Sequence, residues 1–220
     1  MKRILLFCMT ALLAASCADF PTVLYQGLMF GTMQGYSIMH GDDGREYHFT
    51  NITAEMKVPT EGRIVAAFYA TSQIQGAENA YEAELINYSL PVCKDPVPCA
   101  TAEESEALGT EPVQIADGYF GGGCLNLTCN AYFGPNSGVK HELFLAVDNY
   151  SAPSDTLRLS LRHDAHEDSI IGAEIMEFTV KSFYASFPLV DYLPESGDKV
   201  VSISWYWNDE WHTDVRTIKR

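Results

Sequence analysis

The sequence has few positive charges. Among 220 residues, 14 are Lys or Arg and 29 are Asp or Glu, which gives a formal net charge of −15. Binding to a nucleic-acid backbone depends on Lys and Arg side chains that contact phosphates. Docking by charge onto anionic lipid needs the same side chains. The shortage of positive charge therefore argues against nucleic acid as a partner and against attachment to a membrane by charge alone.

The sequence also lacks an N-terminal apolar run long enough to cross a membrane. Residues 1–3 carry two positive charges, and residues 4–15 are apolar apart from Thr10. A membrane-spanning helix needs roughly 20 apolar residues, whereas a charged start, a run of this length and small residues at its end are typical of a secretory signal peptide. We expect residues 1–16 to be removed on export, which leaves a mature net charge of −15 − 2 = −17.

The end of this leader indicates an anchor. Residues 13–17, Leu-Ala-Ala-Ser-Cys, resemble a bacterial lipobox, in which the cysteine becomes the diacylated N-terminal residue. The lipobox pattern favours Leu three residues before the cysteine, and this chain has Ala14 there. Because two or more acyl chains hold a protein stably on a membrane, we expect lipidation at Cys17 and a tether over residues 17–21. The alternative is an ordinary signal peptide followed by an incidental cysteine.

Four cysteines remain for the mature domains: Cys93, Cys99, Cys124 and Cys129. An exported chain meets an oxidising compartment, so Cys93 and Cys99, which flank a Pro-rich turn, are a candidate disulfide. A bridge between Cys124 and Cys129 is disfavoured, because five residues of strand span about 16 Å and bonded Cα atoms lie within about 7 Å. A disulfide between Cys93 or Cys99 and Cys124 or Cys129 remains an alternative. A zinc site is the other alternative, although neither spacing is the usual C-x2-C.

Helical signal is scarce, and nearly every periodic stretch predicts a β-strand. Alternation of apolar and polar residues with one wet face indicates antiparallel sheet, and the turn at 208–210 predicts a hairpin between Trp207 and Trp211. The one candidate helix is 100–108, with Thr101 as N-cap and Glu104 completing a capping box. The clearest strand patterns lie at residues 63–71, 81–88, 157–163 and 200–207.

These elements predict an all-β protein of two domains. Short strands at regular spacing on both sides of a Pro-rich and acidic segment favour two β domains. We expect the first domain at 22–92, a linker at 93–111 and the second domain at 112–220.

The order of motifs along the mature chain resembles the NigD-like lipoproteins of anaerobic Gram-negative bacteria from gut and mouth. Each motif is weak alone, and the resemblance depends on their order and spacing over roughly residues 20 to 215. The four mature cysteines are outside the family pattern. The motifs that carry it are Gly44–Phe49, Val58–Tyr69, Tyr81–Leu90, Leu108–Val113, Gly122–Leu127, His141–Leu145 and Leu157–Asp164.

The resemblance implies an OB-like N-terminal barrel followed by an antiparallel C-terminal β-sandwich, behind a lipid anchor. The founding member of the family is linked to a bacteriocin gene cluster, from which a role in immunity has been suggested. The family brings no catalytic residues that could be carried over to this chain, and it implies that His163, Asp164 and Asp168 belong to a structural turn.

The segment with the most candidate metal ligands is His163-Asp-Ala-His166-Glu-Asp168. Two histidines three residues apart with flanking carboxylates could bind a divalent metal, and a metal-dependent hydrolase built on His163 and His166 is one alternative function. The other interpretation is a polar loop after a strand, where Asp and His are ordinary residues. We favour the loop, and we expect no metal, no cofactor and no catalytic residues.

The aromatic residues around the predicted hairpin are the candidate binding surface. Tyr206, Trp207 and Trp211 could stack on sugar rings or contact a protein partner. Alternatively Trp205 and Trp207 fill the core of the sandwich, which leaves Tyr206 as the better candidate for exposure. We therefore expect a non-enzymatic outer-membrane lipoprotein with a protein or glycan partner. Bacteriocin immunity is the further alternative, and the sequence does not indicate which side of the membrane the domains face.

Overall fold

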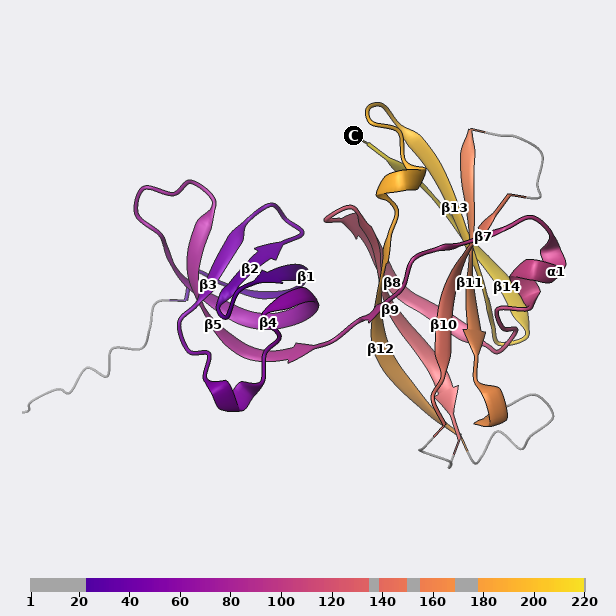
Figure 1. Ribbon diagram of the computed structural model, residues 1–220, viewed down its shortest axis with the longest axis horizontal. Helices are drawn as coiled ribbons and strands as arrows, with labels where there is room; N and C mark the ends of the chain where they lie inside the picture. Colours follow the sequence, from indigo (N-terminus) through magenta and orange to yellow (C-terminus); the bar gives the residue numbers. More distant parts are fainter. Residues whose placement is uncertain (1–22, 135–138, 150–154, 169–177, 220) are drawn as a thin grey trace, which may run out of the picture.

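The computed structural model describes residues 23–134, 139–149, 155–168 and 178–219. Strands dominate these residues, and they form two bodies that lie side by side (Figure 1). No helix in the described part of the chain is long and apolar enough to cross a membrane. The predicted signal peptide, Cys17 and the whole tether lie outside the described residues, so the leader and the lipid anchor stay predictions.

The N-terminal body is a closed five-stranded barrel with the strand order β1-β2-β3-β5-β4. The strands pair antiparallel except for β3 and β5, which run parallel. This barrel stands where the OB-like domain was expected. Its elements are β1 (Tyr25–Gln34), β2 (Ile38–Gly41), β3 (Glu46–Phe49), the 3-10 helix η1 (Ala54–Met56), β4 (Glu61–Gln73) and β5 (Ala80–Ser89).

The barrel core is built around aromatic rings. Phe68 is fully buried, and its ring centroid lies 4.5 Å from that of Tyr47 and 5.9 Å from that of Phe49. Gly27 on the adjacent strand makes room for Phe68, because a Cβ at this glycine would lie 2.4 Å from Phe68 Cζ. The residue types at these positions therefore fit one another closely, as expected for a small barrel whose interior is filled by side chains.

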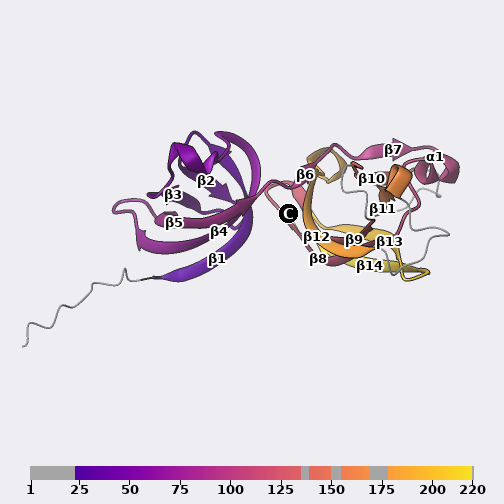
Figure 2. The ribbon, with the colours of Figure 1, turned by 90° about the horizontal axis from the view of Figure 1, so that it is seen from below.

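The C-terminal body is a sandwich of two sheets, with the strand orders β14-β13-β11-β10-β7 and β6-β12-β9-β8. Figure 2 shows the two layers from below. The five-stranded sheet contains β7 (Val97–Cys99), β10 (Glu142–Asp148), β11 (Thr156–Asp164), β13 (Lys199–Trp207) and β14 (Glu210–Ile218). The four-stranded sheet contains β6 (Val92–Cys93), β8 (Val113–Gly121), β9 (Cys124–Phe133) and β12 (Thr179–Pro188).

The sandwich core follows the predicted alternation. Leu159 and Leu161 are each 1% exposed and point between the sheets, as do Val201 and Ile203. The all-β class, the barrel and the sandwich are confirmed. The sheets are mixed rather than purely antiparallel, because β7, β13 and β6 each run parallel to a neighbour.

The segment predicted as a linker is part of the sandwich. Strand β6 pairs with β12 in one sheet, and β7 pairs with β10 in the other. The helix α1 (Ala102–Glu106) follows, with Thr101 accepting a hydrogen bond from Glu104 N at 3.2 Å, as the capping box predicts. The sequence pattern did not indicate the two strands because each is only two or three residues long. The second body therefore begins at about β6, and the expected linker over 93–111 is corrected.

Two further 3-10 helices lie at strand ends, η2 (His166–Asp168) after β11 and η4 (Val190–Tyr192) after β12. Leu189, at the start of η4, is fully buried in the sandwich core. Its amide donates to Gly123 O at 2.9 Å, which attaches this connection to the β8–β9 turn.

A buried ion pair of the barrel is hydrogen-bonded to the sandwich. Arg63 of β4 binds Asp42 through two hydrogen bonds of 2.6 Å. The side chain of Asn126, on β9, both accepts from Arg63 and donates to Asp42, each at 2.8 Å. The side chains of Asp42 and Arg63 are 3% and 12% exposed. Because a buried charge is costly unless it is paired and hydrogen-bonded, this network fixes the register between barrel and sandwich.

Candidate functional site

The two histidines considered as metal ligands do not face each other. His163 lies on the inner face of β11 and is 2% exposed. His166, in η2, has a positive φ of 50° and lies near the carboxylates of Asp164 and Glu142, at 3.2 and 3.6 Å. No three His, Cys, Asp or Glu side chains among the described residues are grouped to hold a metal ion. The hydrolase alternative thus loses the convergence of His163 and His166 that it requires.

His163 instead meets a histidine that the sequence did not single out. His141 Nδ1 lies 2.9 Å from His163 Nε2, and His141 Nε2 lies 3.0 Å from Asp168 Oδ2. Asp168 also accepts from Gly134 N at 2.8 Å, and the Phe133 ring stacks on His141 with centroids 4.0 Å apart. His141 begins one of the family motifs, but no sequence signal paired it with His163, because its partners come from distant segments.

The hydrogen bonds of this cluster determine where its protons lie. His163 Nδ1 contacts Pro112 O at 3.1 Å, and a carbonyl only accepts, so Nδ1 carries a hydrogen. In a neutral His163 the Nε2 atom must accept from His141 Nδ1. The pKa of His163 is lowered to about 4, mainly by burial and in addition by the nearby His141.

All hydrogen-bonding atoms of His163 are thus used inside the protein. A general base or metal ligand needs a lone pair that a substrate or ion can reach. His163 Nε2 contacts His141 Nδ1. Both side chains are almost completely buried. We conclude that this cluster holds together the start of β10, the end of β11 and η2.

The four cysteines are free thiols. The candidate bridge between Cys93 and Cys99 does not form, because β6 and β7 belong to different sheets, and packed sheets lie about 10 Å apart. Pairing between Cys93 and Cys124 is blocked as well. The two flank β12 on opposite sides, and two strand spacings amount to about 10 Å, which exceeds the Cα separation of a disulfide.

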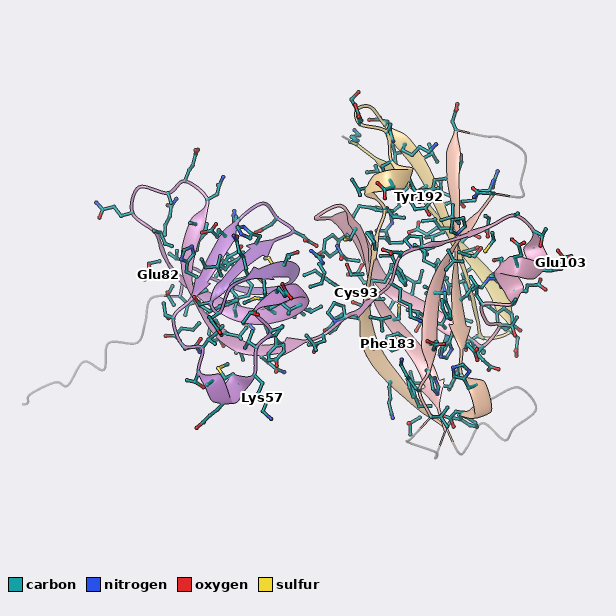
Figure 3. The ribbon with its side chains drawn as sticks, in the orientation of Figure 1. Lys57, Glu82, Cys93, Glu103, Phe183 and Tyr192 are labelled. Atoms are coloured by element: carbon teal, nitrogen blue, oxygen red, sulfur yellow. The ribbon has the colours of Figure 1, made fainter. Side chains whose placement is uncertain are left out.

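None of the three thiols with a shifted pKa is activated. Burial raises the pKa of Cys129 to about 12, and burial is also the main cause that raises the pKa of Cys93 and Cys99. Cys93 lies at the neck between the two bodies (Figure 3), where it lines a cleft of about 330 Å³ together with Arg63 and Cys124. The thiolate is the reactive form, so the raised pKa values disfavour reactivity at these three thiols; Cys99 and Cys129 are buried, and Cys93 is exposed.

The aromatic residues of the β13–β14 hairpin divide between the two faces of the sheet. Trp207 is 7% exposed and stacks on Tyr132 with ring centroids 4.7 Å apart, so it is not part of a surface. Trp205 also packs against the sandwich core. On the outer face, Tyr206 lies opposite Trp211, with ring centroids 5.7 Å apart. Trp211 is 56% exposed.

The guanidinium of a buried arginine lies against the Trp211 ring. The Arg162 guanidinium lies 5.1 Å from the centroid of the Trp211 ring and is within range for a cation–π interaction. Arg162 Nε donates to Ser105 Oγ of α1 at 3.1 Å. Arg162 is 6% exposed and Ser105 is fully buried, so the guanidinium is held in place. Ser105 of α1 therefore holds Arg162 of β11, and Arg162 lies against the exposed Trp211 ring of β14.

Comparison with known proteins identifies the family. Residues 95–219, more than half of the chain, match the model of the NigD-like C-terminal beta sandwich domain. The chain belongs to the NigD-like family. The match begins within the Cys93–Cys99 segment, in agreement with the assignment of β7 to the sandwich. No curated protein matches the chain.

Three solved structures share the NigD-like fold over 89% of this chain. A protein of unknown function from Bacteroides vulgatus has a TM-score of 0.69 and 16% identity, with 92% of its own chain covered. A NigD-like immunity protein from Bacteroides caccae has a TM-score of 0.61, 16% identity and 94% coverage. A protein named as a lipoprotein from Bacteroides fragilis has a TM-score of 0.60, 14% identity and 98% coverage. At these identities the likeness concerns the fold.

Proposed function

We propose that this NigD-like protein is a lipid-anchored, non-catalytic binding module of the outer membrane. Its contact surface is the outer face of the five-stranded sheet around Trp211 and Tyr206. The observation that carries the proposal is the exposed Trp211 ring above the buried and hydrogen-bonded Arg162.

The geometry of this surface favours recognition by contact. Trp, Tyr and Arg are enriched among the residues that dominate binding energy at interfaces. A large ring with few rotatable bonds loses little conformational entropy on binding, and Arg162 and Tyr206 already restrict Trp211 on two sides. A protein partner fits this combination better than a glycan, because only part of Tyr206 is exposed and one full ring is available for stacking.

The anchor part of the proposal is supported by the sequence before residue 18 and by the lipoprotein name of one structural relative. A Cys17→Ser variant is expected to leave the outer-membrane fraction and to lose incorporation of radiolabelled fatty acid. Retention of the label by the variant would place the acyl group elsewhere.

The binding part is tested by photo-crosslinking in living cells, with a photoreactive residue in place of Tyr206, which lies opposite Trp211 on β13 and away from the β14 edge. Trp211→Ala should lower the yield of a discrete crosslinked species by about tenfold, since truncation of a central aromatic costs at least 1–2 kcal/mol. Val180→Ala is the matched control, because Val180 is 53% exposed on β12 of the other sheet. Equal yields from both variants, or no crosslinked species with the parent chain, would contradict the proposal.

Bacteriocin immunity is a second candidate, supported by the name of the Bacteroides caccae structure. In that case the captured partner is a toxin. Deletion of the gene should then sensitise the cell to a bacteriocin produced by its own or a neighbouring strain, and unchanged killing in a zone-of-inhibition assay removes this candidate.

A further inference from the structure

The sandwich has four sheet edges, and three of them are unsuited to pairing with another strand. Strand β6 is two residues long, β7 is three residues long and contains Pro98, and β8 has a register shift between Ile115 and Asp117. Short strands, proline and bulges are the devices by which proteins block edge-to-edge association. Strand β14 has none of them: it is nine residues long, contains no proline and pairs with β13 without a shift.

The hairpin turn determines which backbone groups of β14 are free. Asn208 and Asp209 have φ values of 52° and 63°, as in a type I′ two-residue turn, so Trp207 and Glu210 form a hydrogen-bonded pair. Hydrogen-bonded and non-bonded positions alternate along an antiparallel ladder. The N–H and C=O groups of Trp211, Thr213, Val215 and Thr217 therefore point to the open edge.

The sequence of β14 is complementary to itself about Thr213. In an antiparallel pair of two copies centred there, Glu210 lies opposite Arg216 of the second copy, and His212 lies opposite Asp214. On the other face, Trp211 lies opposite Val215, and Thr213 lies opposite Thr213. Glu210 with Arg216 is a pair of opposite charges, and aromatic with β-branched residues and Thr with Thr are likewise favourable cross-strand pairs.

Neighbouring registers lose this match. Centred on Asp214, the pair would place two Asp214 carboxylates opposite each other, and centred on His212 it would place Glu210 opposite Asp214. Like charges directly opposite are destabilising. Centred on Val215, the pair would leave Glu210 and Trp211 beyond the end of the other strand, which stops at Ile218.

We propose that two copies of this protein associate through β14, antiparallel and centred on Thr213, so that their five-stranded sheets become one continuous sheet. The interface is isologous, as in most homodimers. It brings each Trp211 beside Val215 of the second copy and places the two aromatic surfaces on the same side of the joined sheet. The pairing uses backbone groups that are independent of the partner-binding role of Trp211.

The test is disulfide crosslinking of the full-length chain in cell envelopes, in a background with Cys93→Ser and Cys124→Ser. On the proposed axis the two copies of residue 213 form a hydrogen-bonded pair with Cα atoms about 5.5 Å apart, within disulfide range. A Thr213→Cys variant should therefore give a covalent dimer under mild oxidation. Val215→Cys is the matched control, because the two copies of residue 215 lie about 13 Å apart in this register.

We expect at least about tenfold more dimer from Thr213→Cys than from Val215→Cys, given the narrow range of disulfide Cα distances. Equal yields would indicate random collision, and more dimer from Val215→Cys would indicate another register. Either result, or no dimer from both, overturns the proposal. A charge exchange gives a second check: Glu210→Arg should abolish the Thr213→Cys dimer, and addition of Arg216→Glu should restore it.

Discussion

The barrel and the sandwich differ in whether their sheets have edge strands. The barrel closes on itself through β1 and β4, so all five strands have two neighbours. The sandwich leaves four edges. Closure removes unpaired backbone groups altogether, whereas an open sheet keeps them available. The comparison places the surfaces that can accept a partner in the sandwich, which also carries the exposed Trp211.

The two bodies also differ in their cores and in their optical signals. The barrel core is rich in aromatic rings around Phe68, while the sandwich core consists mainly of Leu, Val and Ile side chains. All three tryptophans, at positions 205, 207 and 211, belong to the sandwich. Tryptophan fluorescence therefore reports on the sandwich alone, and the unfolding of each body can be followed separately.

The largest expected effect comes from Phe68→Ala in the barrel. Removal of a fully buried phenyl ring costs about 4 kcal/mol through lost transfer free energy and the cavity left behind. The barrel transition, followed by far-UV circular dichroism in urea, should move to a lower concentration, and the tryptophan-detected transition should move little. A shift of both transitions by the same amount would show that the two bodies unfold as one unit.

A somewhat smaller effect is expected from Asp42→Ala at the junction. The change leaves the buried Arg63 guanidinium without its carboxylate, and removal of one partner of a buried pair costs about 3 kcal/mol. In scanning calorimetry the barrel transition should move to a lower temperature, because Asp42 and Arg63 both belong to the barrel. The control is Asp42→Leu combined with Arg63→Met, which removes both charges and should recover most of the stability. A double variant as unstable as the single one would contradict this account.

The third effect, similar in size to the second, is acid destabilisation of the sandwich alone. The pKa of His163 falls to about 4 in the folded state, below its ordinary value of 6.5. Between these values the unfolded chain binds more protons, so the free energy of unfolding falls as the pH is lowered from about 6.5 to 4, by on the order of 3 kcal/mol. Tryptophan-detected urea unfolding at several pH values measures this loss. His163→Gln should flatten the profile in that window, and an unchanged slope would assign the loss to other groups.

Much of the fold could be predicted because local patterns determine it. Alternation at Leu157, Leu159 and Leu161 predicts the buried face of β11, and the turn after Trp207 predicts the β13–β14 hairpin. The cap of α1 follows from Thr101 and Glu104, three residues apart. These features depend on neighbours within a few residues, so sequence alone is sufficient for them.

The tertiary structure alone decided which distant side chains meet. His141, His163 and Asp168 gather because the start of β10, the end of β11 and η2 lie at the same place. Asn126 meets Asp42 and Arg63 of the barrel because the two bodies touch. Spacing along the chain carries no record of such contacts. The sequence by itself determined strand periodicity, turn chemistry, family membership and the acidic charge. The packing of the sheets decided which histidine is enclosed, which tryptophan is exposed and which edge stays open, because these depend on distances through space.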